Sequence, residues 1–355
     1  MELEELLQSI PDMDENAENA ARSRQQELTK PRGSLGKLEH LSIQIAGITA
    51  NPSPRLDQKV VFVMAGDHGV ASEGVSAYPP EVTAQMMLNF LHGGAAINVL
   101  ARHVGAKVVI VDMGVAVDLP HHPDLVVKKI GRATHNITLE AAMTRAQAIQ
   151  AILAGAELAR SEIEHGAKAI ATGEMGIGNT TPSAAIMAAL KAAPLEICVG
   201  RGTGLDDEGL KRKRNVVEQA LRVNQPNPRD GLDVLSKLGG FEIAGLVGVI
   251  LGGASMRVPV VLDGFITGAA AMVAVTLQPR VRHFLIASHC SKEQGHPKML
   301  EWLSLNPLLD LDLRLGEGSG AVLGLFILDA ACKILSEMAT FSEAGVSDKD
   351  DLSNG

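Results

Sequence analysis

KVVFVMAGDHG, residues 59–69, is the stretch that decides the fold, because a continuous apolar run ends there in small and polar residues. Four later stretches repeat this form, with helical segments between them. They are residues 106–115, 167–181, 259–265 and 282–291. Runs that are apolar on both faces and alternate with helices are typical of a parallel sheet covered on both sides. The sequence therefore predicts an α/β fold with a parallel, Rossmann-like sheet covered by helices on both faces.

Polar side chains follow these five predicted strands. In open parallel sheets the ligand site lies beyond the carboxyl ends of the strands. Position alone therefore makes eight residues candidates for a site. They are Asp67, His68, Asp112, Glu174, Asn179, Asp263, Ser288 and His289.

The first 58 residues are predicted to form helices rather than strands. Residues 3–10 and 15–29 are rich in helix formers, and Lys30-Pro31 ends the second of these helices. A further helix is expected from about Leu35, because apolar residues recur at helical spacing up to Ile48. These helices precede every predicted strand, which indicates a separate helical subdomain. The polar, acidic tail is expected to be disordered.

Composition excludes several classes of protein. The formal net charge of −9 argues against a general nucleic-acid binder, which needs a surplus of Lys and Arg. The uncharged run at 243–256 is shorter than the ~20 residues needed to span a bilayer, so no membrane span is predicted. Three separated cysteines and an acidic N-terminus favour a reducing compartment, the cytoplasm. The histidines show no metal-ligand spacing, and no metal site is predicted.

Two glycine-containing loops are candidates for binding a phosphate. In GEMGIGNTTPSAAI (173–186), Gly176 and Gly178 allow close approach of the backbone, and a helix N-terminus follows. An ordinary strand–turn–helix with a capping threonine explains this pattern equally well. The second loop, at 199–204, precedes the basic cluster Lys211–Arg214. That cluster is either a solvated helix face or the source of one lysine that binds the phosphate.

Glu317, in RLGEGSGA (314–321), stands between two glycines just before a long apolar run. One interpretation is a carboxylate at the start of a helix, whose field lowers its pKa. The other is a carboxylate in an apolar pocket, which raises its pKa and suits it to accept a proton from a weakly acidic N–H. Tyr78 and the methionine-rich segment after it would either join the core or form a slot for a flat ring.

Taken together and in this order, seven stretches resemble the nicotinate-nucleotide–dimethylbenzimidazole phosphoribosyltransferase family. They are KPRGSLGKLE, AGDHGVASEGVSAYPPEVTAQM, GEMGIGNTTPSAAI, NQPNPRDGLDVLSKLGGFEIAGLVG, VLDGF, ASHCSKEQGH and LRLGEGSGA. The resemblance covers residues 30 to about 335, nearly the whole chain. It implies a homodimer with a large α/β domain, 59–321, and a small helical domain formed by 1–58 and 322–345. Residues 346–355 would be the disordered tail.

The resemblance also implies the reaction. Phosphoribosyl would pass from nicotinate mononucleotide to 5,6-dimethylbenzimidazole, giving α-ribazole 5′-phosphate and nicotinate with inversion at the anomeric carbon. This step belongs to the assembly of the nucleotide loop of cobalamin. A monophosphate donor has no diphosphate that needs magnesium, so neither a metal nor another cofactor is expected.

The resemblance assigns roles to individual residues. Glu317 matches the general base, and Glu174 matches a second carboxylate near the ribose. The nucleotide-binding motifs fall on Gly176, Gly178, Asn179, Thr180, Thr181, Gly202 and Lys213, and the base-pocket segment on Tyr78, Gln85 and Met86. A non-catalytic sensor of a nucleotide or azole on the same scaffold is the alternative. A Rossmann-type reductase is disfavoured, because AGDHGV lacks the dinucleotide fingerprint.

Overall fold

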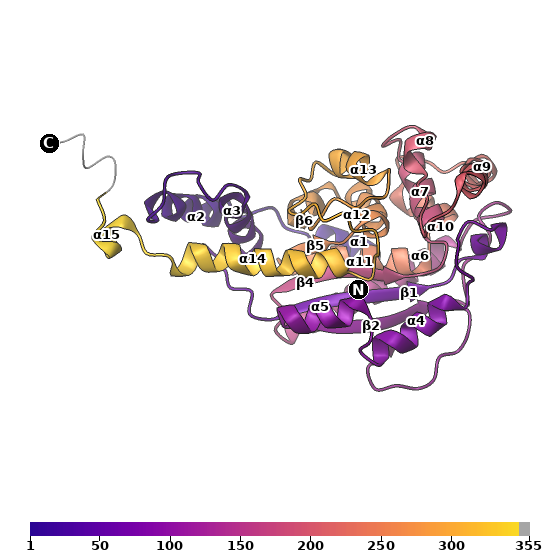
Figure 1. The fold of residues 1–355 in the computed structure, drawn as a ribbon, viewed down its shortest axis with the longest axis horizontal. Helices are drawn as coiled ribbons and strands as arrows, with labels where there is room; N and C mark the ends of the chain where they lie inside the picture. The colour runs from indigo at the N-terminus through magenta and orange to yellow at the C-terminus, as the bar shows by residue number, and fades with distance from the viewer. Residues whose placement is uncertain (348–355) are drawn as a thin grey trace.

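A computed structural model describes residues 1–347 and contains one six-stranded parallel sheet in the order β3-β2-β1-β4-β5-β6 (Figure 1). The strands are β1 (Lys59–Gly66), β2 (Ala106–Gly114), β3 (Leu125–Val127), β4 (Ala169–Met175), β5 (Val260–Leu262) and β6 (Leu285–Ala287). This is the strand order of a doubly wound Rossmann-like sheet, which confirms the predicted fold class. The edge strand β3 was not predicted, because three half-exposed residues give too short an apolar run.

Strand β1 is buried along its whole length because helices cover both faces of the sheet. Val60, Phe62 and Met64 join one core cluster, whereas the alternate residues Val61 and Val63 join the other. The first cluster also contains residues of α6 (Arg145–Glu164), α7 (Thr180–Ala189), α9 (Asp207–Asn224), α10 (Gly231–Leu238), α11 (Phe241–Ser255), α12 (Phe265–Leu277) and α13 (His296–Leu303). The second contains residues of α3 (Lys37–Thr49), α4 (Val82–Leu91), α5 (Ala96–Val104) and α14 (Ser319–Glu337). The period-two alternation of a strand divides its side chains between these two cores.

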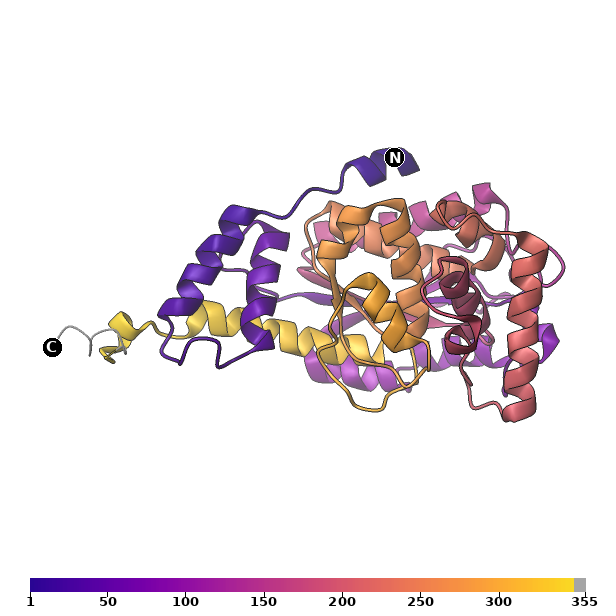
Figure 2. The same cartoon turned by 90° about the horizontal axis from the view of Figure 1, so that it is seen from above.

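Segments from both chain ends lie side by side beyond one end of the sheet (Figures 1 and 2). Here α2 (Glu15–Glu27) and α3 pack against α14, and α15 (Phe341–Ala344) follows. Leu335 of α14 packs with Ala21, Ile43 and Ala46 in a small separate cluster. By contrast α1 (Leu3–Gln8) lies against the sheet domain, where Leu6 joins the main core. The predicted helical domain of 1–58 with 322–345 remains a prediction, and residues 348–355 of the predicted tail 346–355 lie outside the described residues.

Helix α14 has the length and hydropathy of a membrane-spanning helix, but much of it is used in packing. Its most apolar window is 56% buried inside the protein. Asp329, in the middle of the helix, forms an ion pair with Lys59 at 3.2 Å. A core helix passes the same composition test, so α14 is no clear membrane span.

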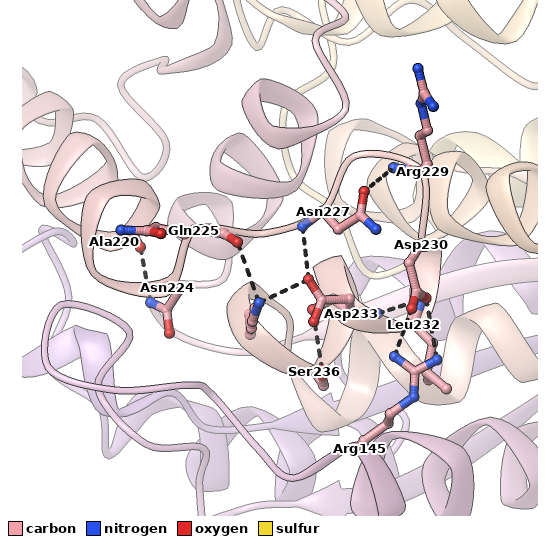
Figure 3. A network of polar contacts seen from close by, with 11 residues as sticks. Arg145, Ala220, Asn224, Gln225, Asn227, Arg229, Asp230, Leu232, Asp233 and Ser236 are labelled. Atoms are coloured by element: carbon pink, nitrogen blue, oxygen red, sulfur yellow. Dashed lines mark hydrogen bonds and ion pairs between the residues drawn. The ribbon is translucent and has the colours of Figure 1, made fainter.

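A polar network fixes the segment that leads into helices α10 and α11 (Figure 3). The Asp230 carboxylate caps α10 by accepting hydrogen bonds from the backbone N–H groups of Leu232 at 3.0 Å and Asp233 at 3.1 Å. Arg145, at the start of α6, donates to the same carboxylate at 2.9 Å. The loop before α10 is thereby tied to α6.

We expect Asp230→Ala to lower the free energy of unfolding by about 1 kcal/mol, the usual loss for an N-cap. The ion pair adds little, because Arg145 is half exposed. Burial would raise the pKa of Asp230, but Arg145 and the capped N–H groups outweigh it and the pKa is lowered. The cap therefore stabilises the protein above the ordinary pKa of 3.8, and this stabilisation is lost as pH falls through the lowered pKa.

Urea unfolding of wild type and variant at pH 7 and near pH 3 measures this difference. Arg229→Ala is the matched control, because that exposed side chain points away from the network (Figure 3). Equal stability of Asp230→Ala and wild type at pH 7 would show that the cap contributes nothing.

Candidate active site

A cavity of about 430 Å³ lies beyond the carboxyl ends of β4, β5 and β6. This is the edge of the sheet at which the sequence predicted a site. The lining residues are Tyr78, Val82, Met86, Glu174, Met175, Gly176, Ile177, Asn179, Thr180, Gly202, Thr203, Asp263, Gly264, Phe265, Ile266, Thr267, His289, Ser291, Glu293, Arg314, Leu315, Gly316 and Glu317.

Glu317 stands on a strained turn that ends at the first residue of α14. Gly316, Glu317 and Gly318 all have positive φ angles, of 87°, 63° and 91°. Glycine adopts this region freely, whereas a left-handed non-glycine residue costs on the order of 1–3 kcal/mol. The turn lies directly on β4, where the absence of a side chain at Gly173 leaves room for the backbone of Glu317. The surrounding structure therefore maintains an unfavourable backbone conformation that aims Glu317 into the cavity.

Asp263, the residue after β5, holds this turn in place. Its carboxylate accepts backbone N–H groups from Gly318 at 3.2 Å, Gly320 at 2.7 Å and Ala321 at 3.0 Å. Burial raises the pKa of Asp263 to about 7; these hydrogen bonds oppose the rise, and the Glu317 carboxylate adds to it. Asp263 thus connects the sheet to the start of α14 and positions Glu317.

The Glu317 carboxylate is buried, with 6% of the residue exposed. It accepts a hydrogen bond from the backbone N–H of Ile97, in the first turn of α5, at 3.3 Å. Burial raises the pKa of Glu317, and the Ile97 N–H opposes this without cancelling it. Of the two opposing effects predicted from the sequence, burial is therefore the larger, and Glu317 is a stronger base than an exposed glutamate.

Glu174, near the end of β4, lies beside the same turn. Its carboxylate occupies the space that a side chain at Gly316 would need, and it accepts a hydrogen bond from the Asn179 side-chain amide. Burial raises the pKa of Glu174 to about 8; the Asn179 amide opposes the rise, and nearby carboxylates, including Asp263 and Glu317, add to it. At neutral pH Glu174 therefore holds a proton in the ligand-free protein.

Another corner of the cavity is suited to an anion. Lys213 of α9 is fully buried and donates to the Thr180 hydroxyl, at the start of α7, at 2.6 Å. Burial lowers the pKa of Lys213 to about 8, and the Glu293 carboxylate opposes this. Within residues 1–347, no carboxylate oxygen lies within 4.0 Å of the Lys213 ammonium. A buried cation, a hydroxyl and a helix N-terminus together favour a phosphate group.

Apolar side chains make up much of the remaining wall. They are Tyr78, Val82, Met86, Met175, Ile177, Phe265, Ile266 and Leu315. Tyr78 and Leu315 are more than half exposed, so this part of the cavity opens to the surface. A largely apolar slot beside a buried carboxylate suits a flat heteroaromatic ring.

Comparison with known proteins agrees with this geometry. Residues 10–346 match a family model described as phosphoribosyltransferase. The chain belongs to this phosphoribosyltransferase family. Proteins named nicotinate-nucleotide–dimethylbenzimidazole phosphoribosyltransferase are 60% identical in Roseiflexus sp. (strain RS-1) and 51% identical in Geobacter sulfurreducens. Each alignment covers 98% of this chain, with 98% of the first relative and 99% of the second.

A solved structure gives the same result for the fold of this phosphoribosyltransferase. The enzyme of that name from Thermus thermophilus superimposes with a TM-score of 0.90 at 47% identity. The match covers 95% of this chain and 100% of the Thermus chain.

The structure brings most of the predicted site residues of this phosphoribosyltransferase together. Glu317, Glu174, Gly176, Asn179, Thr180, Gly202, Tyr78 and Met86 all line the cavity. Lys213 lies behind the wall and reaches it through Thr180. Gly178 and the buried Thr181 belong to the same loop without lining the cavity, and Gln85 is exposed on α4, outside it. The assigned roles remain proposals.

Among the strand-end candidates, Asp263 and His289 also line the cavity, whereas the others have structural partners. Asp67 accepts the Ala116 N–H, Asp112 pairs with Lys129, and Ser288 lies next to the His289 ring. Sequence reasoning missed Ser291, Glu293 and Phe265 as individual residues. Their only signal was that they lie in the family-like stretches ASHCSKEQGH and VLDGF.

Proposed function

We propose that this protein transfers phosphoribosyl from nicotinate mononucleotide to 5,6-dimethylbenzimidazole, forming α-ribazole 5′-phosphate and nicotinate. The step serves the assembly of the nucleotide loop of cobalamin. One observation carries the proposal: the buried Glu317 carboxylate shares a cavity with an apolar slot and a corner suited to phosphate. The names of the relatives support the same reaction.

Glu317 acts as the general base. It removes the N–H proton of the benzimidazole while the other ring nitrogen bonds to the anomeric carbon of the ribose. The bond from that carbon to the pyridinium nitrogen breaks, and its electron pair stays on the nitrogen. Because the departing ring loses its positive charge, it needs no acid catalyst. The incoming azole alone needs help, which one base supplies.

Glu174 stabilises positive charge at the ribose. It is protonated in the empty site at neutral pH, since burial raises its pKa to about 8. A cationic pyridinium nearby favours the carboxylate form, so the donor itself promotes ionisation of Glu174. The resulting carboxylate interacts with the charge that develops at the anomeric carbon.

The donor phosphate binds at the corner formed by Lys213 and Thr180. Gly176, Gly178, Asn179, Thr181 and Gly202 shape the two loops around it. Tyr78 and Met86 line the slot for the base. Gln85 lies on α4, next to Met86 in sequence, and faces solvent. This division places phosphate, ribose and base along one cavity. No cofactor is required.

We further propose that the protein works in the cytoplasm as a homodimer. Val99 of α5 and Phe326 of α14 are 53% and 59% exposed, and these helices pack together on the same face of the sheet. Exposed apolar side chains on adjacent helices favour an interface with a second copy.

Phe326→Glu is expected to convert the dimer to a monomer, because a charge buried in an apolar interface lacks a partner. Light scattering coupled to size exclusion gives the mass directly. Val346→Glu, a change at an exposed apolar residue outside these helices, is the control and should leave the dimer intact. A monomeric wild-type protein would contradict the proposal.

Incubation with nicotinate mononucleotide and dimethylbenzimidazole tests the reaction. We expect free nicotinate and α-ribazole 5′-phosphate in equal amounts, identified by chromatography and mass spectrometry. Binding of both ligands without release of nicotinate would instead indicate a sensor. The comparisons do not favour that alternative, because the family model and the relatives describe transferases.

A further inference from the structure

His68 and Glu242 form a buried ion pair to which the proposed reaction gives no role. His68 follows β1, and Glu242 lies in the first turn of α11. Their side chains meet with His68 Nε2 2.8 Å from Glu242 Oε1. The residues are 4% and 0% exposed, and neither lines the cavity.

The pair is enclosed by three glycines. A side chain at Gly66 would meet the Glu242 carboxylate at 2.9 Å. One at Gly176 would overlap the Gly66 carbonyl oxygen and lie 3.2 Å from His68 Nε2. A side chain at Gly240 would overlap both members of the pair. The pair therefore packs directly on the backbone where the end of β1, the start of α11 and the β4–α7 loop meet.

Through Gly176 the pair supports the loop that carries the nucleotide contacts. The point at which a Gly176 side chain would begin lies 3.2 Å from His68 Nε2 and 3.4 Å from the Asn179 side-chain nitrogen. That Asn179 amide donates to Glu174. The imidazole therefore occupies the space beside the bare Cα of Gly176 and close to the Asn179 amide. Its loss would leave this part of the loop, and through Asn179 the carboxylate proposed to face the ribose, without that support.

Stability alone does not account for an ion pair here. His68 Nδ1 and Glu242 Oε2 are buried without a hydrogen-bond partner among the described residues. Apolar side chains of similar volume would fill the space without such unpaired atoms, and buried ion pairs are weak evidence for stability. A role in holding the loop explains why polar groups stand at this point.

The charges around His68 favour its imidazolium form. Burial would lower the pKa of His68, but the charge and hydrogen bond of Glu242, with the charge of Asp67, outweigh it and the pKa is raised. The Glu242 charge also contributes to the raised pKa of Glu174. The imidazolium form of His68 is thus favoured beside Glu242, close to the group proposed to ionise when the donor binds.

We propose that His68 and Glu242 are positioning residues for the nucleotide-binding loop, holding Gly176 and Asn179 where Glu174 and the phosphoribosyl donor meet. This inference rests on the proposed function, because it assigns the loop to nicotinate mononucleotide. It concerns mainly how the donor is bound, because Gly176 and Asn179 lie among the nucleotide contacts, whereas Ile177 of the same loop lines the base slot.

Three variants separate a positioning role from a merely structural one: Glu242→Gln, His68→Gln and the double variant. Either single change is expected to raise the KM for nicotinate mononucleotide about tenfold or more, with a clearly smaller rise in the KM for dimethylbenzimidazole. In the double variant two neutral amides can hydrogen-bond to each other, so most of the donor affinity should return. Asp329→Asn is the control, because it weakens the partly buried Lys59–Asp329 pair at the opposite end of β1. It should leave both KM values within twofold.

The inference is overturned if both single variants keep the donor KM within twofold of wild type while their unfolding midpoints fall like that of Asp329→Asn. If a single variant does not fold, the double variant is compared with the other single variant by its KM for nicotinate mononucleotide. The double variant leaves no unpaired buried charge and is therefore the more stable test. A double variant no better than the folded single variant also counts against the inference. Absence of nicotinate release by the wild-type protein would instead refute the proposed function, which keeps the two failures distinct.

Discussion

Glu317→Gln is expected to lower kcat roughly 100- to 10,000-fold, the usual contribution of a general base, while nicotinate mononucleotide still binds. Glutamine keeps the shape and can accept the Ile97 N–H, but it cannot take the proton from the azole. Steady-state kinetics give the loss in kcat, and calorimetry gives the donor affinity. A near-normal rate would remove Glu317 from the mechanism.

Two further measurements isolate proton removal. Burial raises the pKa of Glu317, so wild-type activity should fall as pH decreases through that raised pKa, because the base becomes protonated. The Gln variant should lack this limb of the profile. With the more acidic acceptor 5,6-dichlorobenzimidazole, Glu317→Gln should lower kcat by a smaller factor than with dimethylbenzimidazole, because the N–H proton of the dichloro compound leaves more easily. Equal losses for the two acceptors would indicate that Glu317 acts through position alone.

Lys213→Met is expected to raise the KM for nicotinate mononucleotide roughly 30- to 1,000-fold, equivalent to about 2–4 kcal/mol for a lost buried charge contact. Methionine fills similar space without a charge, so the fold should not be weakened. Lys211→Met is the matched control, because Lys211 is exposed on the same helix. A weakened donor affinity in both variants would point to general surface charge rather than to a phosphate site.

The pH dependence of donor binding provides a second check on Lys213. Burial lowers its pKa to about 8, so in wild type the ammonium is lost as pH rises through that value. Donor affinity should therefore decline in mildly alkaline solution, whereas the Met variant should show no such decline from this group. Bound phosphate will stabilise the charged form and move the decline to higher pH.

The basic cluster Lys211–Arg214 shows why the phosphate corner was only partly predictable. The sequence left open whether the cluster was a solvated helix face or contained one lysine that binds phosphate. The structure contains both: Lys211 and Arg212 are exposed, whereas Lys213 points inward to Thr180. Helical spacing tells which residues share a face, but which face turns inward depends on α7, which is distant in sequence.

Glu242 was not predicted at all. It lies in a helix that is otherwise apolar and buried up to Ala254, and nothing in its immediate sequence marks its partner His68. The two residues meet because α11 packs across the end of β1, a contact between segments more than 170 positions apart. Such long-range packing decides which residue pairs with a buried charge, and the local sequence pattern does not predict it.

From the sequence alone came the parallel α/β architecture, the edge of the sheet that carries the site, and the candidate residues Glu317, Glu174 and Asp263. The architecture, the sheet edge, Glu174 and Asp263 follow from local periodicity and from polar residues at strand ends, which short-range sterics and burial dictate. Glu317 came instead from its glycine-flanked turn and from the family resemblance. Tertiary structure alone decided that Ile97 faces Glu317, that Asp263 ties down its turn, and that burial outweighs the opposing hydrogen bond in setting the Glu317 pKa. Desolvation and hydrogen bonding depend on which distant segments enclose a group, and only the packed chain brings those segments together.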